Sequence, residues 1–331
     1  RDRFVLSAGH GSMLQYALLH LTGYALPLDE LRRFRQWESL TPGHPEYGVT
    51  PGVDATTGPL GQGISNAVGM AIAEAHLAAR FNRDGHTLID HHTYVIAGDG
   101  DLMEGVQSEA CSLAGQLQLG KLIVLYDSNG ITLAGSTSLT FSEDVAARFR
   151  AYGWHVQLVE DGNNLAMVES ALCVARDVVD QPSLIVVRTV IGFGAPHKQG
   201  TFGVHGSPLG AAETRAAKEN LGWPVEPAFY IPDDVAAHMG VGVARGAAAE
   251  TDWQQRLAAD SAAHPESAAE LHRRLAGELP HDWDAELPTF AADATGMATR
   301  KASELTMQSL APHLPELFGG SADLDPSTLT A

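Results

Sequence analysis

Two oxygen-bearing side chains in this sequence are spaced so that both can reach one divalent cation. Asp99 stands in the turn Gly98–Gly100, and Asn129 follows the apolar run 121–126 about one strand–helix–strand unit later. In a right-handed βαβ unit the two strands are parallel, so both side chains emerge at the same edge of the sheet. Carboxylate and amide oxygens are hard donors that suit Mg²⁺ or Ca²⁺. The spacing therefore predicts a metal site at that edge.

The turn around Asp99 also suits a diphosphate. Its flanking glycines let a ligand approach the backbone, and a helix from about Glu104 would present unpaired N–H groups to an anion. Open parallel sheets bind ligands at this carboxyl edge. A Gly-Asp-Gly turn alone is equally consistent with an ordinary loop. The prediction of a divalent ion bridging protein and diphosphate therefore depends on Asp99 and Asn129 together.

Composition excludes several classes of function. The chain has 331 residues, with 40 acidic against 21 basic side chains and a net charge of −19. That balance argues against binding to nucleic acid and to anionic membranes, both of which require clustered basic residues. No apolar run approaches the length of about 18 residues that would suggest a spanning helix. The two cysteines, Cys111 and Cys173, are too few for a disulfide framework and predict a cytoplasmic protein.

The elements that must position these residues alternate between short apolar runs and longer segments of helical period. This alternation is typical of an α/β fold with a mostly parallel sheet flanked by helices. The predicted strands are residues 3–6, 93–97, 122–126, 154–159 and 184–190. The predicted helices are residues 62–81, 104–117, 144–152 and 164–179.

The composition of the sequence changes after about Gly222. Prolines at 224, 227 and 232 precede the alanine-rich helical segments 253–263 and 265–276. We therefore predict a first domain over residues 1–222, a linker with helices over 223–297, and the start of a second α/β domain over 298–331. In this last part, residues 300–310 are expected to form a helix and 317–321 the entry to a strand. Neither end of the chain resembles a natural terminus, so we expect segments to be missing at both.

Longer motifs extend the pattern around Asp99 and Asn129. The turn Gly98–Gly100 with its downstream Asn129 resembles the signature of thiamine-diphosphate enzymes, and the wider sequence resembles the transketolase family. The matching segments cover nearly the whole chain in the family's order; they are residues 4–11, 41–46, 57–70, 98–105, 191–194, 204–209, 298–303 and 319–324. The resemblance implies a thiamine-diphosphate-binding fold followed by a truncated pyrimidine-binding domain.

The resemblance implies a metal and cofactor site. The metal ligands would be Asp99, Asn129 and the carbonyl of Ile131, holding Mg²⁺, Ca²⁺ or Mn²⁺. The family more often has aspartate at the position of Ser128. This difference changes the residue next to the predicted ligand Asn129 and leaves Asn129 in place. Thiamine diphosphate would further contact residues from five segments of the chain: His10, Gly58, Pro59, Leu60, Gly98, Gly100, His205 and Asp323.

Histidine suits both proton transfer and hydrogen bonding near neutral pH. By resemblance, His10 and His205 contact the cofactor or the groups that exchange protons, and His44 contacts the hydroxyls of the donor sugar together with His205. An isolated histidine in a loop more often only forms hydrogen bonds with the backbone. The match to the family's motifs reverses that expectation for His10, His44 and His205. Glu104 and Glu109 match carboxylates that join two active sites across a dimer interface, although an acid at Glu104 could simply complement a helix dipole.

Anionic sugar phosphates require local cations in an acidic protein. Arg300 matches a family arginine that grips the substrate phosphate, and Ser327 matches a hydroxyl at the same phosphate; Lys198 is a weaker second candidate. On sequence alone, a surface residue at a helix N-terminus is the favoured interpretation of Arg300, and only the resemblance favours the phosphate contact. The glutamate that activates the aminopyrimidine ring, and a further histidine upstream, have no counterpart here. We therefore expect the 331 residues alone to be inactive.

The resemblance implies a homodimeric transketolase of the pentose phosphate pathway, which transfers a two-carbon ketol unit from a ketose phosphate to an aldose phosphate. Dihydroxyacetone synthase, with formaldehyde as acceptor, is an alternative within the same chemistry. A catalytically silent binding or regulatory relative is an alternative of another class, disfavoured by the intact site residues. An NAD-binding Rossmann domain is disfavoured, because no G-x-G-x-x-G follows a strand at the start of a βαβ unit.

Overall fold

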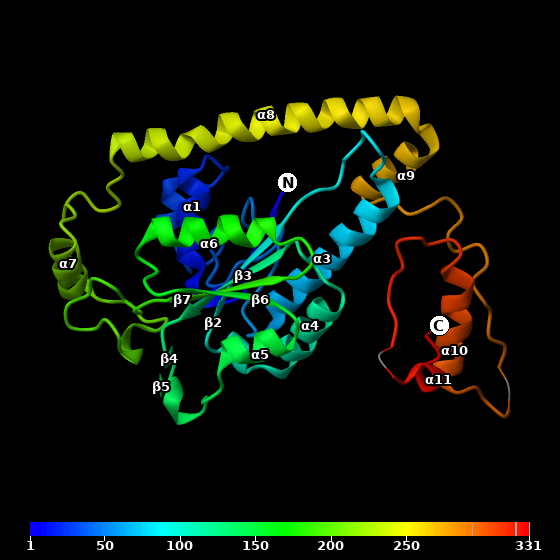
Figure 1. Ribbon diagram of the computed structural model, residues 1–331, viewed down its shortest axis with the longest axis horizontal. Helices are drawn as coiled ribbons and strands as arrows, with labels where there is room; N and C mark the ends of the chain where they lie inside the picture. Colours follow the sequence, from blue (N-terminus) through cyan, green and yellow to red (C-terminus); the bar gives the residue numbers. More distant parts are fainter. Residues whose placement is uncertain (293, 322, 331) are drawn as a thin grey trace. The chain divides into compact units, whose positions relative to one another are not determined.

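The computed structural model describes residues 1–292, 294–321 and 323–330, and its centre is a parallel β-sheet (Figure 1). The sheet has five strands in the order β1-β2-β3-β7-β6, and every neighbouring pair is parallel. The strands are β1 (Arg3–Leu6), β2 (Thr93–Gly98), β3 (Leu122–Ser128), β6 (His155–Val159) and β7 (Ser183–Arg188). A separate antiparallel pair is formed by β4 (Ile131–Thr132) and β5 (Gly135–Ser136). The predicted fold class is confirmed.

Helices cover both faces of the sheet. Figure 1 shows α6 (Leu165–Asp177) on one side and α3 (Gln62–Phe81), α4 (Gly105–Gln116) and α5 (Val145–Ala151) on the other. Within β3, Ile123 packs in the cluster under α6, whereas Leu122 and Val124 pack in the larger cluster under the other three helices. This two-sided burial explains why the strands are continuous apolar runs with little alternation.

The ends of α3 follow from its sequence. Gly61 precedes the helix with φ of 77°, a left-handed conformation that glycine adopts without strain. Ile64, Ala67 and Val68 then lie on the buried stripe that helical periodicity predicted. The helix ends at Phe81, and its bounds match the predicted range of 62–81. This long helix fixes where the glycine-rich loop before it meets the sheet.

Several helices carry weaker sequence signals and were not predicted. A small apolar cluster, separate from the sheet, joins α1 (Ser12–Leu21) and α2 (Leu28–Arg32) through Tyr16 and Leu31. Two others are α7 (Ala211–Asn220) and α8 (Asp233–Ala263). Only the end of α8, residues 253–263, was predicted, because the glycines in its first half have low helix propensity.

The described residues form two compact units, Arg1–Gln254 and Gln255–Ala331. In the second unit lie α9 (Pro265–Leu275), α10 (Thr299–Leu310) and α11 (Asp325–Thr328), and Arg273 and Arg274 both pair with Glu316. The strand entry predicted at 317–321 is wrong. Those residues are irregular, and no strand lies within the described part of that unit for them to pair with. The domain limits at 222 and 297 stay a prediction.

No helix in the described part of the chain combines the length and apolarity needed to cross a bilayer. The longest helix, α8, carries Asp233, Asp234 and further charged residues along its length.

Two helical glycines allow a matched test of packing. A Cβ at Gly115 in α4 would lie 1.8 Å from the carbonyl oxygen of Tyr152, whereas a Cβ at Gly69 in α3 would meet nothing within 4 Å. We predict that Gly115→Ala lowers the free energy of unfolding by about 2–3 kcal/mol through overpacking. Gly69→Ala should raise it by up to about 1 kcal/mol through helix propensity. Urea unfolding followed by circular dichroism measures both, and equal effects would contradict the packing.

Candidate active site

Asp99 and Asn129 lie at the same carboxyl edge of the sheet. Asp99 directly follows β2 and Asn129 directly follows β3, and Gly98 and Asp127 are register partners between these strands. The backbone N–H of Gly130 donates to Oδ2 of Asp99 over 2.9 Å. The structure therefore brings the carboxylate of Asp99 against the turn that carries Asn129.

The oxygens of this pair retain capacity for a cation. The hydroxyl of Tyr126 donates to Oδ1 of Asp99 over 2.5 Å, and the N–H of Ile131 donates to Oδ1 of Asn129 over 3.0 Å. Each of these oxygens keeps a further lone pair, as a metal ligand needs. Ile131 opens β4, so its carbonyl belongs to the same turn.

Electrostatics at Asp99 also fits a cation. Its side chain is 5% exposed, and burial raises its pKa; the hydrogen bonds from Tyr126 and Gly130 oppose the rise and the charge of Asp127 adds to it. Among the described residues no lysine or arginine pairs with Asp99. A bound divalent ion would stabilise the ionised carboxylate that burial disfavours. The described residues contain no cluster of three or more His, Cys, Asp or Glu side chains suited to a metal, so amide and carbonyl oxygens would have to contribute.

Glycines let separate loops approach this edge. Gly58 has φ of 141°, and a Cβ there would lie 3.2 Å from Cγ of His44. A Cβ at Gly100 would lie 2.9 Å from Cδ1 of Leu60. The loop with Gly58, Pro59 and Leu60 therefore lies between the turn after β2 and the segment that carries His44. The predicted cofactor contacts Gly58, Leu60, Gly98 and Gly100 thus belong to adjacent segments.

Sequence reasoning missed Asp101, which is completely buried. Its Oδ1 accepts hydrogen bonds from the hydroxyl of Ser7 (2.7 Å) and the N–H of Gly61 (2.9 Å). Its Oδ2 accepts one from the N–H of Gly98 over 3.0 Å. The second aspartate in Gly98-Asp99-Gly100-Asp101 was visible in the sequence. However, nothing there showed that its partners would come from the end of β1 and the start of α3.

Two of the predicted histidines stack on each other. The rings of His10 and His205 have centroids 4.6 Å apart and planes inclined by 19°. Burial lowers the pKa of His10 first, and the charges of His205 and His44 lower it further. Burial also lowers the pKa of His205, although the charge of Asp127 opposes this. Both imidazoles are therefore held toward the neutral form.

The stacked pair also lies near the predicted metal ligands. His205 is close enough to Asp127 to feel its charge, and Oδ2 of Asp127 accepts a hydrogen bond from the amide of Asn129 over 3.1 Å. Nδ1 of His205 is buried and makes no hydrogen bond with any described residue. An unpartnered buried nitrogen is costly unless a ligand satisfies it. The residues present therefore fit a polar cofactor.

His44 is held in a loop fixed from two sides. The hydroxyl of Ser12 donates to the carbonyl of Gly43 over 3.0 Å, and the hydroxyl of Tyr16 donates to the carbonyl of Pro42 over 2.9 Å. On the other side, the N–H of Thr57 donates to the carbonyl of Pro45 over 3.1 Å. This places His44 against Gly58 and close enough to His10 to influence its charge.

Glu104, Glu109 and Lys198 make no described polar contact with this group. Glu104 nevertheless lies against the glycine-rich loop, because a Cβ at Gly61 would come within 2.7 Å of its Cβ. Glu104 is the N-cap of α4 and Glu109 lies on the same helix; both are exposed, and neither side chain has a hydrogen bond or ion pair within the described residues. The ammonium of Lys198 donates to the carbonyl of Leu209 over 3.0 Å in its own loop.

The remaining predicted residues belong to the second unit. Arg300 lies in the first turn of α10, Ser327 lies in α11, and Asp323 precedes α11; all three are exposed. Their roles in binding phosphate and cofactor stay predictions.

The histidine stack allows a test by titration. Since the native pKa of His10 lies below its usual 6.5, the unfolded chain binds protons more tightly than the folded one. The contribution of His10 to stability should therefore be constant above about pH 6.5 and fall as the pH drops from there through the native pKa. We predict that His205→Gln moves the pKa of His10 back toward 6.5, whereas His238→Gln on α8 leaves it unchanged. Titration of the imidazole resonances by NMR would measure this, and an unmoved pKa of His10 in His205→Gln would contradict the coupling.

Comparison with known proteins agrees with this geometry. Residues 1–280 match the family model described as "Transketolase, thiamine diphosphate binding domain". The chain is 58% identical to a transketolase from Geobacillus stearothermophilus and 54% identical to transketolase 1 from Escherichia coli; the alignments cover 100% of this chain and 49% and 50% of those proteins.

Solved structures give the same result. The transketolase from Leishmania mexicana is similar at a TM-score of 0.94 and 51% identity, over 100% of this chain and 49% of that one. A Pichia stipitis transketolase in complex with sedoheptulose 7-phosphate is similar at a TM-score of 0.94 and 48% identity, again over 100% and 49%. The chain thus spans about half the length of the relatives it matches. It belongs to the transketolase family, and most of it corresponds to that family's thiamine-diphosphate-binding domain.

Proposed function

We propose that this chain is the diphosphate- and metal-binding part of a transketolase, which transfers a two-carbon ketol unit from a ketose phosphate to an aldose phosphate. The observation that carries the proposal is the meeting of Asp99 and Asn129 at one sheet edge, next to a stacked pair of neutral histidines. Family membership supplies the type of reaction. The chain spans about half of its relatives' length, so turnover would require the remaining part of the family's length as well.

Binding of the cofactor would depend on charge. Asp99, Asn129 and the carbonyl of Ile131 would hold a divalent ion, and the N–H groups of the turn after β2 would face the diphosphate. When bound, thiamine diphosphate supplies a nucleophilic carbon and an electron sink for cleavage of a C–C bond. Gly58, Leu60 and Gly100 would permit close approach of the cofactor to the backbone.

The histidines would accept protons and bind the hydroxyls of the sugar. With their pKa values lowered by burial, His10 and His205 are neutral near pH 7 and can accept a proton. The unpartnered Nδ1 of His205 is one atom where a proton or hydrogen bond could be held. His44 would donate to or accept from hydroxyls of the donor sugar. Exclusion of water by the loops around Gly58 would strengthen each of these interactions.

Residues outside this group would complete the site in a homodimer. Arg300 would grip the phosphate of the sugar with Ser327, because a guanidinium forms two parallel hydrogen bonds with phosphate. Asp323 would face the cofactor at the subunit interface. Exposed Glu104 and Glu109 would face the partner subunit and link the two active sites. Both glutamates are exposed in the single chain, as residues at a subunit interface would be.

The metal site can be tested on this chain without turnover. We predict that Asp99→Asn abolishes the Mg²⁺-dependent part of thiamine diphosphate binding, because it removes the anionic ligand. The control is Asp90→Asn, which makes the same charge change before β2, at the opposite edge of the sheet, and should leave the affinity unchanged. Isothermal titration calorimetry with and without Mg²⁺ would measure both. Equal affinities for wild type and Asp99→Asn would rule out this metal site.

The reaction itself requires a polypeptide of the family's full length that contains this chain. Such a protein should transfer a ketol unit from a ketose phosphate to an aldose phosphate in a coupled assay. We predict that Arg300→Ala raises KM for phosphorylated sugars by about tenfold or more, corresponding to roughly 1.5–3 kcal/mol for a charge-assisted hydrogen bond. KM for unphosphorylated sugars should change little. Similar effects on both kinds of sugar would mean that Arg300 does not contact phosphate, and absence of turnover by wild type would refute the proposed activity.

A further inference from the structure

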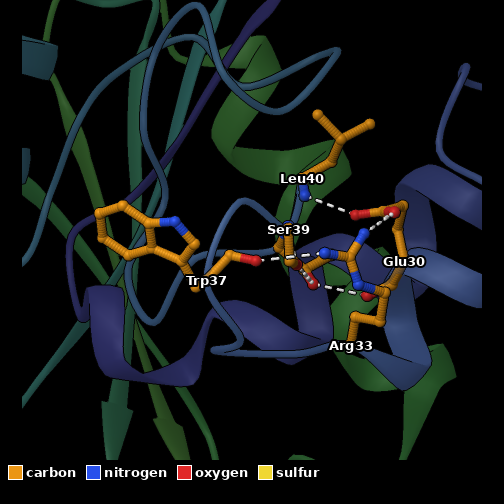
Figure 2. Close-up of polar contacts among 6 residues, drawn as sticks. Glu30, Arg33, Trp37, Ser39 and Leu40 are labelled. Carbon is orange, nitrogen blue, oxygen red and sulfur yellow. Dashed lines mark hydrogen bonds and ion pairs between the residues drawn. The ribbon is translucent and has the colours of Figure 1, made fainter.

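Glu30 in α2 contacts Leu40, in the loop that leads on to His44; Figure 2 shows the contact between Glu30 and Leu40. One oxygen of its carboxylate, Oε2, accepts a hydrogen bond of 2.6 Å from the N–H of Leu40. The other, Oε1, accepts one of 2.9 Å from the guanidinium of Arg33. The backbone carbonyl of Glu30 accepts a third, of 2.6 Å, from the hydroxyl of Thr41. One residue thus holds the end of the segment 34–41 by both its side chain and its backbone.

Arg33 holds the middle of the same segment. Its guanidinium donates to the carbonyl of Trp37 over 3.1 Å while it pairs with Glu30 (Figure 2). Within the segment, Arg35 and Glu38 have φ of 62° and 56°, a left-handed conformation that is unfavourable for side chains with a Cβ. Such strain persists only where surrounding contacts determine the conformation. The Glu30–Arg33 pair supplies contacts of that kind.

The constraint extends to His44 through Arg35. The N–H of Arg35 donates to the carbonyl of Thr41 over 2.9 Å. Its guanidinium lies over Gly43, where a Cβ would come within 2.8 Å of Nε. The side chain of Glu30 is only 16% exposed, so its hydrogen bonds are shielded from water. A continuous set of contacts therefore runs from Glu30 through Leu40, Thr41 and Gly43 to His44.

We propose that Glu30 is a positioning residue for His44. It fixes the loop 34–44 in one conformation, so that the imidazole stands against Gly58 before any sugar arrives. This inference rests on the proposed function for what His44 binds, namely the hydroxyls of the donor sugar. Its structural part, the dependence of the loop and of His44 on Glu30, stands on the contacts alone.

Amide hydrogen exchange on the 331-residue chain tests the structural part. Glu30→Ala should speed exchange at Leu40 by about tenfold or more, because a charge-assisted hydrogen bond is lost. The His44 imidazole resonance should shift or broaden in the same variant. Glu30→Gln keeps an acceptor for Leu40 and should restore most of the protection. The matched control is Asp29→Asn in the same helix, whose carboxylate is 81% exposed and pairs only with Arg32 among the described residues.

Kinetics in a full-length protein that contains this chain tests the role in binding sugar. Glu30→Ala should raise KM for the donor ketose phosphate by about tenfold while kcat falls less, because the positioning of a binding group is lost. The affinity for thiamine diphosphate should not change. Glu30→Gln should recover most of the loss, and Asp29→Asn should behave as wild type.

The outcomes separate the two proposals. Unchanged exchange at Leu40 and an unchanged His44 resonance in Glu30→Ala would overturn the inference. So would an equal loss of cofactor affinity and donor affinity, which indicates general destabilisation. If the wild-type protein shows no ketol transfer, the proposed function fails, and the exchange and His44 measurements alone then decide whether Glu30 positions that residue.

Discussion

The site depends on one buried carboxylate. Asp101 binds three donors from three segments of the chain: Ser7 after β1, Gly61 before α3, and Gly98 at the end of β2. Ser7 in turn accepts from the N–H of Ile64 in the first turn of α3. Hydrogen bonds to a charged group are stronger than neutral ones, and leaving a buried donor unpaired is costly. This group therefore holds the loops of His10, the glycine-rich segment and Asp99 in a common position.

Sequence patterns predicted the sheet and the meeting of Asp99 with Asn129 because both follow from local rules. Periodicity defined the strands and helices, and the right-handed connection placed both residues at one edge. By contrast, the burial of Asp101 depends on contacts with Gly61 and Ser7, which lie 40 and 94 residues away in the chain. No spacing in the sequence reveals these contacts. The same holds for the stacking of His10 on His205, which was predicted only as a shared role through family resemblance.

Two elements differ from the prediction for separate physical reasons. The first half of α8 was not predicted because Gly240, Gly242 and Gly246 have low helix propensity. The sequence predicts the entry to a strand at residues 317–321, yet a strand forms only where a neighbour completes its hydrogen bonds.

The negative charge of the site would determine the order in which a metal ion and the cofactor bind. Asp99 and Asp127 face the carboxyl edge, and the nearby Arg188 donates to the hydroxyl of Ser128 rather than pairing with Asp99. A diphosphate approaching this edge without a cation would meet like charge, which is repulsive even where water screens it. A divalent ion would reverse that local charge and would also offset the energetic cost of burying the ionised Asp99. The metal would therefore create the affinity for an anionic cofactor that a protein of net charge −19 otherwise lacks.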